Sequence, residues 1–197
     1  MDFVNKVKGF LTEPSKTFDA SKEDTLSDAV QYYAIIVAIY SLLFALLFAF
    51  AFSLVGSMMG FGQLGMMTGT GAGIGGAISI FIMLLIFGII GAFIGGAILH
   101  IFVYIVGGRK GIAQTIKAVM YGSTPGLLFG WIPVIGFIAS IWSLILEILG
   151  IRQLHEITTG RAVLAVLIPV VIMVVLTVVL AAIIASYVFM GVPGRGY

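Results

Sequence analysis

Four long apolar stretches fill most of residues 29–190, and short glycine-rich or cationic segments separate them. The last stretch, residues 162–190, has no ionisable side chain except Tyr187. As a helix it would be roughly 43 Å long, against a hydrocarbon core of about 30 Å. Soluble domains usually carry about 25% charged residues. Because this chain carries only 9%, the sequence predicts an integral membrane protein.

The apolar pattern predicts an all-α membrane bundle in a single transmembrane domain, residues 29–190, with either five crossings or three. The expected spans lie at about 29–55, 77–106, 112–131, 134–149 and 162–190. Pro125 and Pro133 interrupt the region of the third and fourth spans, and the fourth is short for a bilayer. Two short spans or one re-entrant hairpin would both fit there. Either arrangement leaves the two flanks on the same side of the membrane.

A polar leader, residues 1–28, precedes the first span. Its apolar residues recur at helical spacing and are Phe3, Val4, Val7, Phe10 and Leu11. The polar residues expected on the opposite face are Asp2, Asn5, Lys6 and Lys8. This pattern predicts a short amphipathic helix in the headgroup region that ends at Pro14. Thr25 and Asp28 match a capping box, so the first span is expected to start near Leu26.

The placement of the basic residues predicts the orientation. If the N-terminus is cytoplasmic, three polar regions lie on the cytoplasmic side: the leader, the region of the 107–111 turn and the connection at 151–161. Together they hold nine of the ten Lys and Arg residues. The tenth, Arg195, lies in an external tail, residues 191–197. Short cytoplasmic loops of membrane proteins carry an excess of Lys and Arg. We therefore expect a multi-pass protein of the cell membrane with its N-terminus in the cytoplasm and its C-terminus outside.

Few side chains could support chemistry. The chain has no cysteine, His100 and His155 each stand alone, and no serine has an identifiable base beside it. The methionines of the glycine-rich segment 56–76 have no His or Cys near them in the sequence, which disfavours a Cu(I) site. We predict no catalytic, cofactor-binding or metal site.

Glu147 is the one carboxylate inside an apolar run. An ionised group at membrane depth is costly unless it is paired. We expect Glu147 either to form a buried ion pair with a neighbouring cation or to serve as a proton or cation site. The candidate partners are Arg152, Arg161 and Lys117.

Two further groups of residues are candidates for contacts. Small residues at four-residue spacing are expected to pack helices closely, within the chain or between copies, and are Gly91, Gly95, Gly122, Gly126 and Gly130.

Cationic residues near the cytoplasmic ends of the spans are expected to bind anionic lipid headgroups or protein partners, and are Arg109, Lys110, Lys117, Arg152, His155 and Arg161. Nothing in the sequence points to nucleic acid.

Three blocks of sequence resemble the Yip domain family, multi-pass membrane proteins named in eukaryotes for interacting with Ypt/Rab GTPases. The first block is F-L-T-E-P-S-K-T-F, residues 10–18. The second comprises G-G-R-K-G, Y-G-S-T-P and W-I-P-V-I-G within residues 107–136. The third is W-S-L-I-L-E-I-L-G-I-R-Q-L-H-E-I-T-T-G-R-A, residues 142–162. The resemblance covers nearly the whole chain, and it implies five membrane helices with the N-terminus in the cytoplasm. The short leader favours a minimal, prokaryotic member.

The resemblance also implies a role in membrane trafficking and membrane shaping through partners, without catalysis. We therefore expect a non-enzymatic scaffold that organises membrane or binds partners, including a second copy of itself. The alternative is a small transporter or channel for an ion or solute, centred on Glu147 and the proline-interrupted helices.

Overall fold

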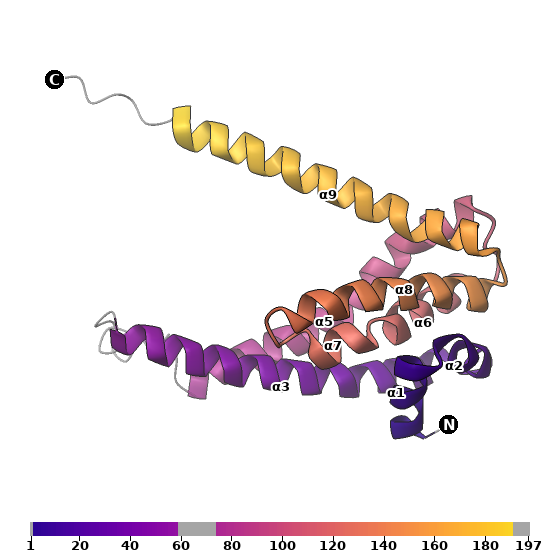
Figure 1. Cartoon of the computed structure of the whole chain (residues 1–197), viewed down its shortest axis with the longest axis horizontal. Coiled ribbons are helices and arrows are strands. Elements are labelled where there is room, and N and C mark those ends of the chain that lie inside the picture. The colour runs from indigo at the N-terminus through magenta and orange to yellow at the C-terminus, as the bar shows by residue number, and fades with distance from the viewer. Residues whose placement is uncertain (1, 59–73, 191–197) are drawn as a thin grey trace.

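The computed structural model describes residues 2–58 and 74–190 of the chain. In this part the chain forms helices joined by short connections. The helices, with the labels of Figure 1, are α1 (Phe3–Thr12), α2 (Pro14–Ala20), α3 (Leu26–Met58), α5 (Ile74–Ile105), α6 (Ile112–Gly122), α7 (Thr124–Phe129), α8 (Ile135–His155) and α9 (Thr159–Met190). The expected external tail and most of the glycine-rich segment, with three of its four methionines, lie outside the described residues.

Four helices are long and apolar enough to cross a membrane, which confirms the all-α membrane class. They comprise Leu26–Leu54, Gly75–Ile105, Ile135–His155 and Thr159–Tyr187. In Figure 1, α9 leaves the α5–α8 region at one end of the molecule and diverges from the other helices. Its buried apolar residues, Ala162, Ala165 and Val166, all lie in its first turns. The remaining length of α9 presents apolar side chains outward, as expected where lipid replaces protein as the neighbour.

The third expected span, 112–131, is divided into α6 and α7, and the count of five spans is not confirmed. The break follows from Pro125, which has no N–H to donate to the carbonyl of Tyr121 four residues earlier. The Thr124 hydroxyl donates to that carbonyl instead, at 2.6 Å. The expected fourth span, 134–149, is in fact the longer helix α8, which extends to His155 and by helical rise is roughly 31 Å long.

The turn between α7 and α8 is apolar and tight. Val134 has a φ of 69°, and the Ile135 N–H donates to the Pro133 carbonyl at 2.8 Å, which is the pattern of a rare, strained γ-turn. Val134 is 79% exposed and Phe137 72% exposed. Figure 1 shows this turn alongside α3, short of the far ends of α3 and α9. Together, α6 and α7 run away from the end where α8 finishes, and α8 returns to it.

Local signals in the leader fix the helix boundaries as expected. The Thr25 N–H donates to Asp28 Oδ2 at 2.8 Å, and the Asp28 N–H donates to Thr25 Oγ1 at 3.2 Å. This reciprocal capping box starts α3 at Leu26. Pro14 occupies the first turn of α2 and separates it from α1.

The face of α1 that packs inward differs from the expected one. Lys6, expected on the outer polar face, is only 7% exposed, whereas Val4, expected on the apolar face, is 70% exposed. The reason is tertiary, because folding brings Lys6 to the Asp24 carboxylate and the Tyr121 hydroxyl. The headgroup-region position of this helix stays a prediction.

Two of the five packing glycines present an open side to their surroundings among residues 2–58 and 74–190. A Cβ on Gly91 or Gly95 would meet nothing within 4 Å. The inward face of α5 is offset around the helix: a Cβ on Gly96 would lie 3.2 Å from the Ile116 Cα, and one on Gly88 would lie 2.9 Å from Val37. Gly91 and Gly95 therefore face outward among the described residues, and their part in helix packing, within the chain or between copies, stays a prediction.

Candidate functional site

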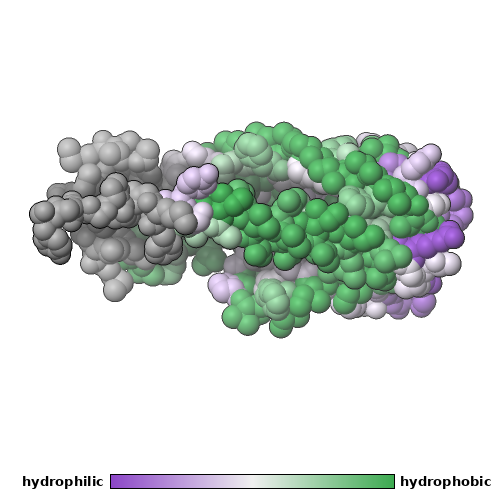
Figure 2. All heavy atoms as spheres, turned by 90° about the horizontal axis from the view of Figure 1, so that it is seen from above, coloured by the Kyte–Doolittle hydropathy of each residue, from purple (hydrophilic) through white to green (hydrophobic). Residues whose placement is uncertain are grey.

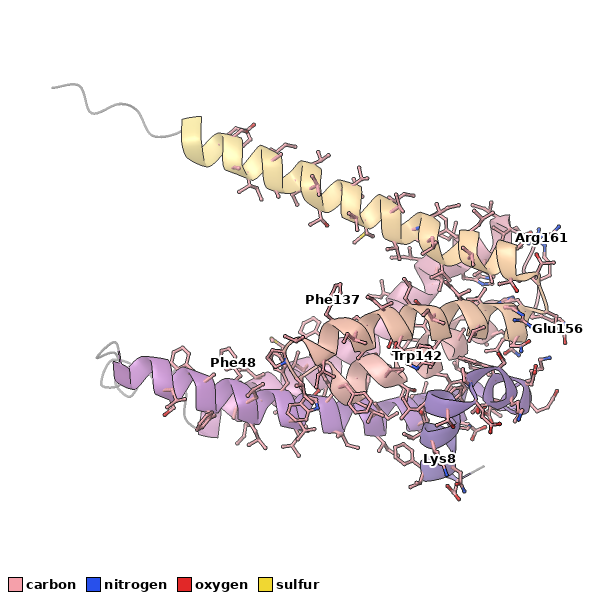
Figure 3. The ribbon with its side chains drawn as sticks, in the orientation of Figure 1. Lys8, Phe48, Phe137, Trp142, Glu156 and Arg161 are labelled. Atoms are coloured by element: carbon pink, nitrogen blue, oxygen red, sulfur yellow. The ribbon has the colours of Figure 1, made fainter. Side chains whose placement is uncertain are left out.

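Polar side chains gather at one end of the molecule. Figure 2 shows this hydrophilic end beside a broad apolar surface. In Figure 3, Lys8, Glu156 and Arg161 lie at that end, although they come from the leader and from the α8–α9 connection. Phe48 and Phe137 lie along the apolar length. The leader, the 106–111 turn and the 156–158 turn thus form one surface, which we call the polar end.

Beneath the polar end, aromatic rings from three parts of the chain pack together. The Phe10 ring stacks on Tyr121 with centroids 4.9 Å apart and contacts Phe18 at 4.8 Å. Tyr32 meets Tyr121 edge-on at 5.2 Å. A Cβ on Gly150 would lie 2.8 Å from the Phe18 ring, so only glycine leaves room for that ring against α8. These contacts fix α1 and α2 onto α3, α6 and α8.

A buried polar group lies beside these rings. Lys6 Nζ is 2.5 Å from Asp24 Oδ2, and the Tyr121 hydroxyl donates to the same oxygen at 2.6 Å. Lys117, which is 1% exposed, donates from Nζ to the carbonyls of Lys22 at 2.9 Å and Asp24 at 2.7 Å. We call Lys6, Asp24, Lys117 and Tyr121 the latch. Lys117 was expected on the lipid-binding face, and this burial removes it from that face.

The two histidines, which look isolated in the sequence, meet through a threonine. His100 Nδ1 is 2.7 Å from Thr115 Oγ1, and the same oxygen is 2.9 Å from His155 Nε2. His155 is 3% exposed, so it too is absent from the surface where it was expected. Its Nδ1 is buried without a hydrogen-bond partner among the described residues. A Cβ on Gly108 would come within 3.0 Å of that nitrogen.

The remaining expected cations form a rim around the turns, where Arg109, Lys110 and Arg161 are exposed and Arg152 is half-buried. Arg109 stacks on the Tyr104 ring at 3.8 Å and donates to the Tyr104 and Gly108 carbonyls. Lys110 pairs with Glu156 at 2.5 Å. Arg161 lies against Gly107. We call Arg109, Lys110, Arg152 and Arg161 the cationic rim. Within residues 2–58 and 74–190, its three arginines have no carboxylate within 4.0 Å.

Glu147 has none of the expected ion pairs. No cation of the described chain lies within salt-bridge distance of its carboxylate, and Lys117 instead bonds backbone carbonyls of residues 22 and 24. Glu147 lines a groove of about 420 Å³ between α3, α7 and α8. The other polar residues lining this groove are Tyr40, Ser123, Ser140 and Ser143.

The three sequence blocks that resemble one family converge in this structure. Phe10 and Phe18 of the first block pack on Tyr121 of the second and Gly150 of the third. A family model, the Yip1 domain, matches residues 8–191. The chain belongs to the Yip1 domain family. The comparisons with curated proteins and with solved structures gave no match. This Yip1-domain chain is a multi-pass membrane protein whose family motifs build its polar end.

Asp24 is a site residue that sequence reasoning missed. Burial alone would raise the pKa of its carboxyl, but hydrogen bonds from Lys6 and Tyr121 and the Lys6 charge lower that pKa below its usual value. The only sequence signal was a carboxylate just before the capping box, in an acidic stretch that resembles a solvated surface. Its lysine and tyrosine partners come from distant parts of the chain.

The pKa of Asp24 predicts how acid affects the latch. A carboxyl whose folded pKa lies below its unfolded pKa of about 4 stabilises the fold above that value, and the contribution disappears as pH falls through the folded pKa. We expect the protection of α1 amides from hydrogen exchange in detergent, relative to the intrinsic exchange rate at each pH, to fall as the pH drops below about 4. The free-energy difference between wild type and Asp24→Asn should shrink over the same range. A difference that stays constant with pH would contradict the pairing.

Proposed function

We propose that this protein is a non-enzymatic membrane scaffold whose polar end faces the cytoplasm and binds anionic lipid headgroups and protein partners. Family membership supports a role in membrane trafficking, as implied for eukaryotic Yip-domain proteins. The observation that carries the lipid-binding part is the cationic rim, because its three arginines lack carboxylate partners in the described chain. Guanidinium groups at a membrane interface suit phosphate oxygens.

The distribution of charge on the polar end supports separate surfaces for lipid and for partners. The leader contains six carboxylates and four lysines within residues 2–28. The rim contributes four cations. The one carboxylate on the α8–α9 turn beside them is Glu156. The rim therefore favours phosphates, whereas the leader side would repel them and favours a partner with exposed basic groups.

The proposed topology follows the direction of the helices. If α3 leaves the cytoplasmic side, α5 returns to it and the unit of α6, α7 and α8 begins and ends there. Helix α9 then crosses again and places the C-terminus outside. In a topology of five crossings, the α7–α8 turn must reach the far interface of the membrane. In a re-entrant hairpin, that apolar turn remains within the lipid. Both keep the rim cytoplasmic, in agreement with the positive-inside rule.

The lipid-binding proposal predicts that the double variant Arg109→Gln/Arg161→Gln binds anionic lipid more weakly. Each juxtamembrane cation contributes about 1 kcal/mol, so losing two should weaken binding by about 2 kcal/mol, roughly thirtyfold in affinity. Native mass spectrometry of the detergent-solubilised protein, titrated with phosphatidylglycerol and phosphatidylcholine, measures this preference.

The matched control is Lys8→Gln/Lys16→Gln, which removes the same charge from the leader. Lys8 is exposed, and Lys16 pairs with Glu13 at 2.7 Å. We expect this control to keep the preference for phosphatidylglycerol. An equal loss in both double variants would mean that net charge alone, and not the rim, attracts the lipid.

A further inference from the structure

The groove between α3, α7 and α8 combines a carboxylate with hydroxyl groups at membrane depth. Ser140, Ser143 and Glu147 follow the spacing i, i+3 and i+7, so they share one face of α8. Glu147 is eight residues before the end of α8, about 12 Å along the helix from the polar end. Opposite them, Gly126 and Gly130 of the α7 segment line the groove. The absence of side chains there leaves the volume open.

The hydrogen bonds of the groove leave it rich in acceptors. The Ser123 hydroxyl donates to the Val119 carbonyl at 2.7 Å, and the Ser140 hydroxyl donates to the Gly136 carbonyl at 2.7 Å. Their protons are used, so each oxygen can only accept from a ligand. The carboxylate of Glu147 adds further acceptor positions and a negative charge. It has no ion-pair or hydrogen-bond partner in the described chain.

Few donors face this set of acceptors. Ser143 accepts the Gly126 N–H at 2.8 Å, which leaves its hydroxyl proton free. Tyr40, half-buried on α3, supplies the other hydroxyl of the lining whose proton is not donated to a described residue. The cations nearest in sequence are occupied elsewhere or lie at the surface, since Lys117 bonds backbone carbonyls. A ligand that brings positive charge to these oxygens would complete this site.

We propose that this groove binds a compact cationic group, with the Glu147 carboxylate as its counter-charge and serine oxygens as neutral ligands. The cationic group can come from a free monovalent cation or from the primary ammonium of an amine-headgroup lipid, since both present positive charge to oxygen acceptors. Ser140 is exposed and Tyr40 and Ser143 are half-buried, so the groove opens at the side of the bundle, where lipid reaches it.

The test measures protection of Glu147 from dicyclohexylcarbodiimide, which reacts with protonated carboxyl groups in apolar surroundings. The full chain is reconstituted in phosphatidylcholine vesicles at one fixed pH, with N-methylglucamine as the bulky cation. Peptide mass spectrometry then gives the labelled fraction of Glu147. Separate arms add sodium, or replace part of the phosphatidylcholine by phosphatidylethanolamine, which is equally uncharged overall.

We expect a several-fold fall in labelling in the sodium arm or in the phosphatidylethanolamine arm, and the arm that protects identifies the source of the cationic group. Ser140→Ala should be labelled as before but lose most of this protection, because one ligand oxygen is gone. The matched control is Ser186→Ala on α9, whose hydroxyl also donates within its own helix, to the Ile183 carbonyl at 2.7 Å. It should be protected like the wild type.

Three results would overturn the proposal. Labelling unchanged by sodium and by phosphatidylethanolamine would mean that no cationic group occupies the groove. An unlabelled Glu147 in every arm would mean that the carboxyl is not reachable from lipid. Protection that persists fully in Ser140→Ala and in Ser143→Ala would place the cation elsewhere. Glu147→Gln serves only to confirm the labelled peptide, so the test does not depend on how this variant folds.

Discussion

Replacing Gly122 with alanine is expected to destabilise the protein, because it places a methyl group against the backbone of another helix. A Cβ at this position would lie 3.0 Å from both the Cα and the backbone N of Glu147. Backbone atoms of α8 cannot rotate away as a side chain can, so α6 and α8 must separate. Overpacking of this kind costs about 1–3 kcal/mol, and the helix preference of alanine over glycine offsets less than about 1 kcal/mol of it. Unfolding in a mild detergent measures the loss.

The matched control is Gly91→Ala, which adds the same methyl group to a helix position with nothing within 4 Å. We expect the control to unfold at the wild-type temperature or slightly above it. Gly122→Ala should also shift the Glu147 environment, because the contact is with the backbone of that residue. Equal stability of the two variants would show that α6 and α8 do not approach as closely as described.

Replacing Asp24 with alanine is the second change with a large expected effect. It removes the acceptor of both Lys6 and Tyr121 and leaves the largely buried Lys6 ammonium without its counter-charge. Losing hydrogen bonds to a charged group costs about 1.5–3 kcal/mol. We expect α1 and α2 to detach from the helical bundle before the spans unfold. Limited proteolysis of the leader and hydrogen exchange of α1 both measure this release.

Glu13→Ala is the control for this prediction, because the Glu13–Lys16 pair is exposed in the same leader. Exposed ion pairs contribute little to stability, so we expect no measurable release. A second variant, Lys6→Met/Asp24→Leu, removes both charges and should recover part of the stability lost in Asp24→Ala. If the double variant releases the leader as fully as Asp24→Ala, the unpaired Lys6 charge is not the cause.

The candidate site was predictable where a residue's role depends on sequence position alone. Arg109, Lys110, Arg152 and Arg161 lie beside turns, and any fold that keeps the apolar stretches in the membrane places them near its surface. Lys117 and His155 follow the same sequence rule and yet are buried. Their burial depends on partners elsewhere in the chain. Lys117 bonds the carbonyls of Lys22 and Asp24 in the α2–α3 connection, and His155 bonds Thr115 of α6.

The sequence by itself determined the membrane class, the long helices and their start and stop signals. Lipid demands that backbone groups bond within each helix, so long apolar runs leave no other choice of secondary structure, and caps such as Thr25 and Asp28 act over three residues. Only the tertiary structure decided which face of each helix turns inward. In lipid there is no water to drive one apolar face of a helix inward in preference to another. The packing is therefore decided by close backbone approach, as at Gly96 and Gly122, and by buried polar partners.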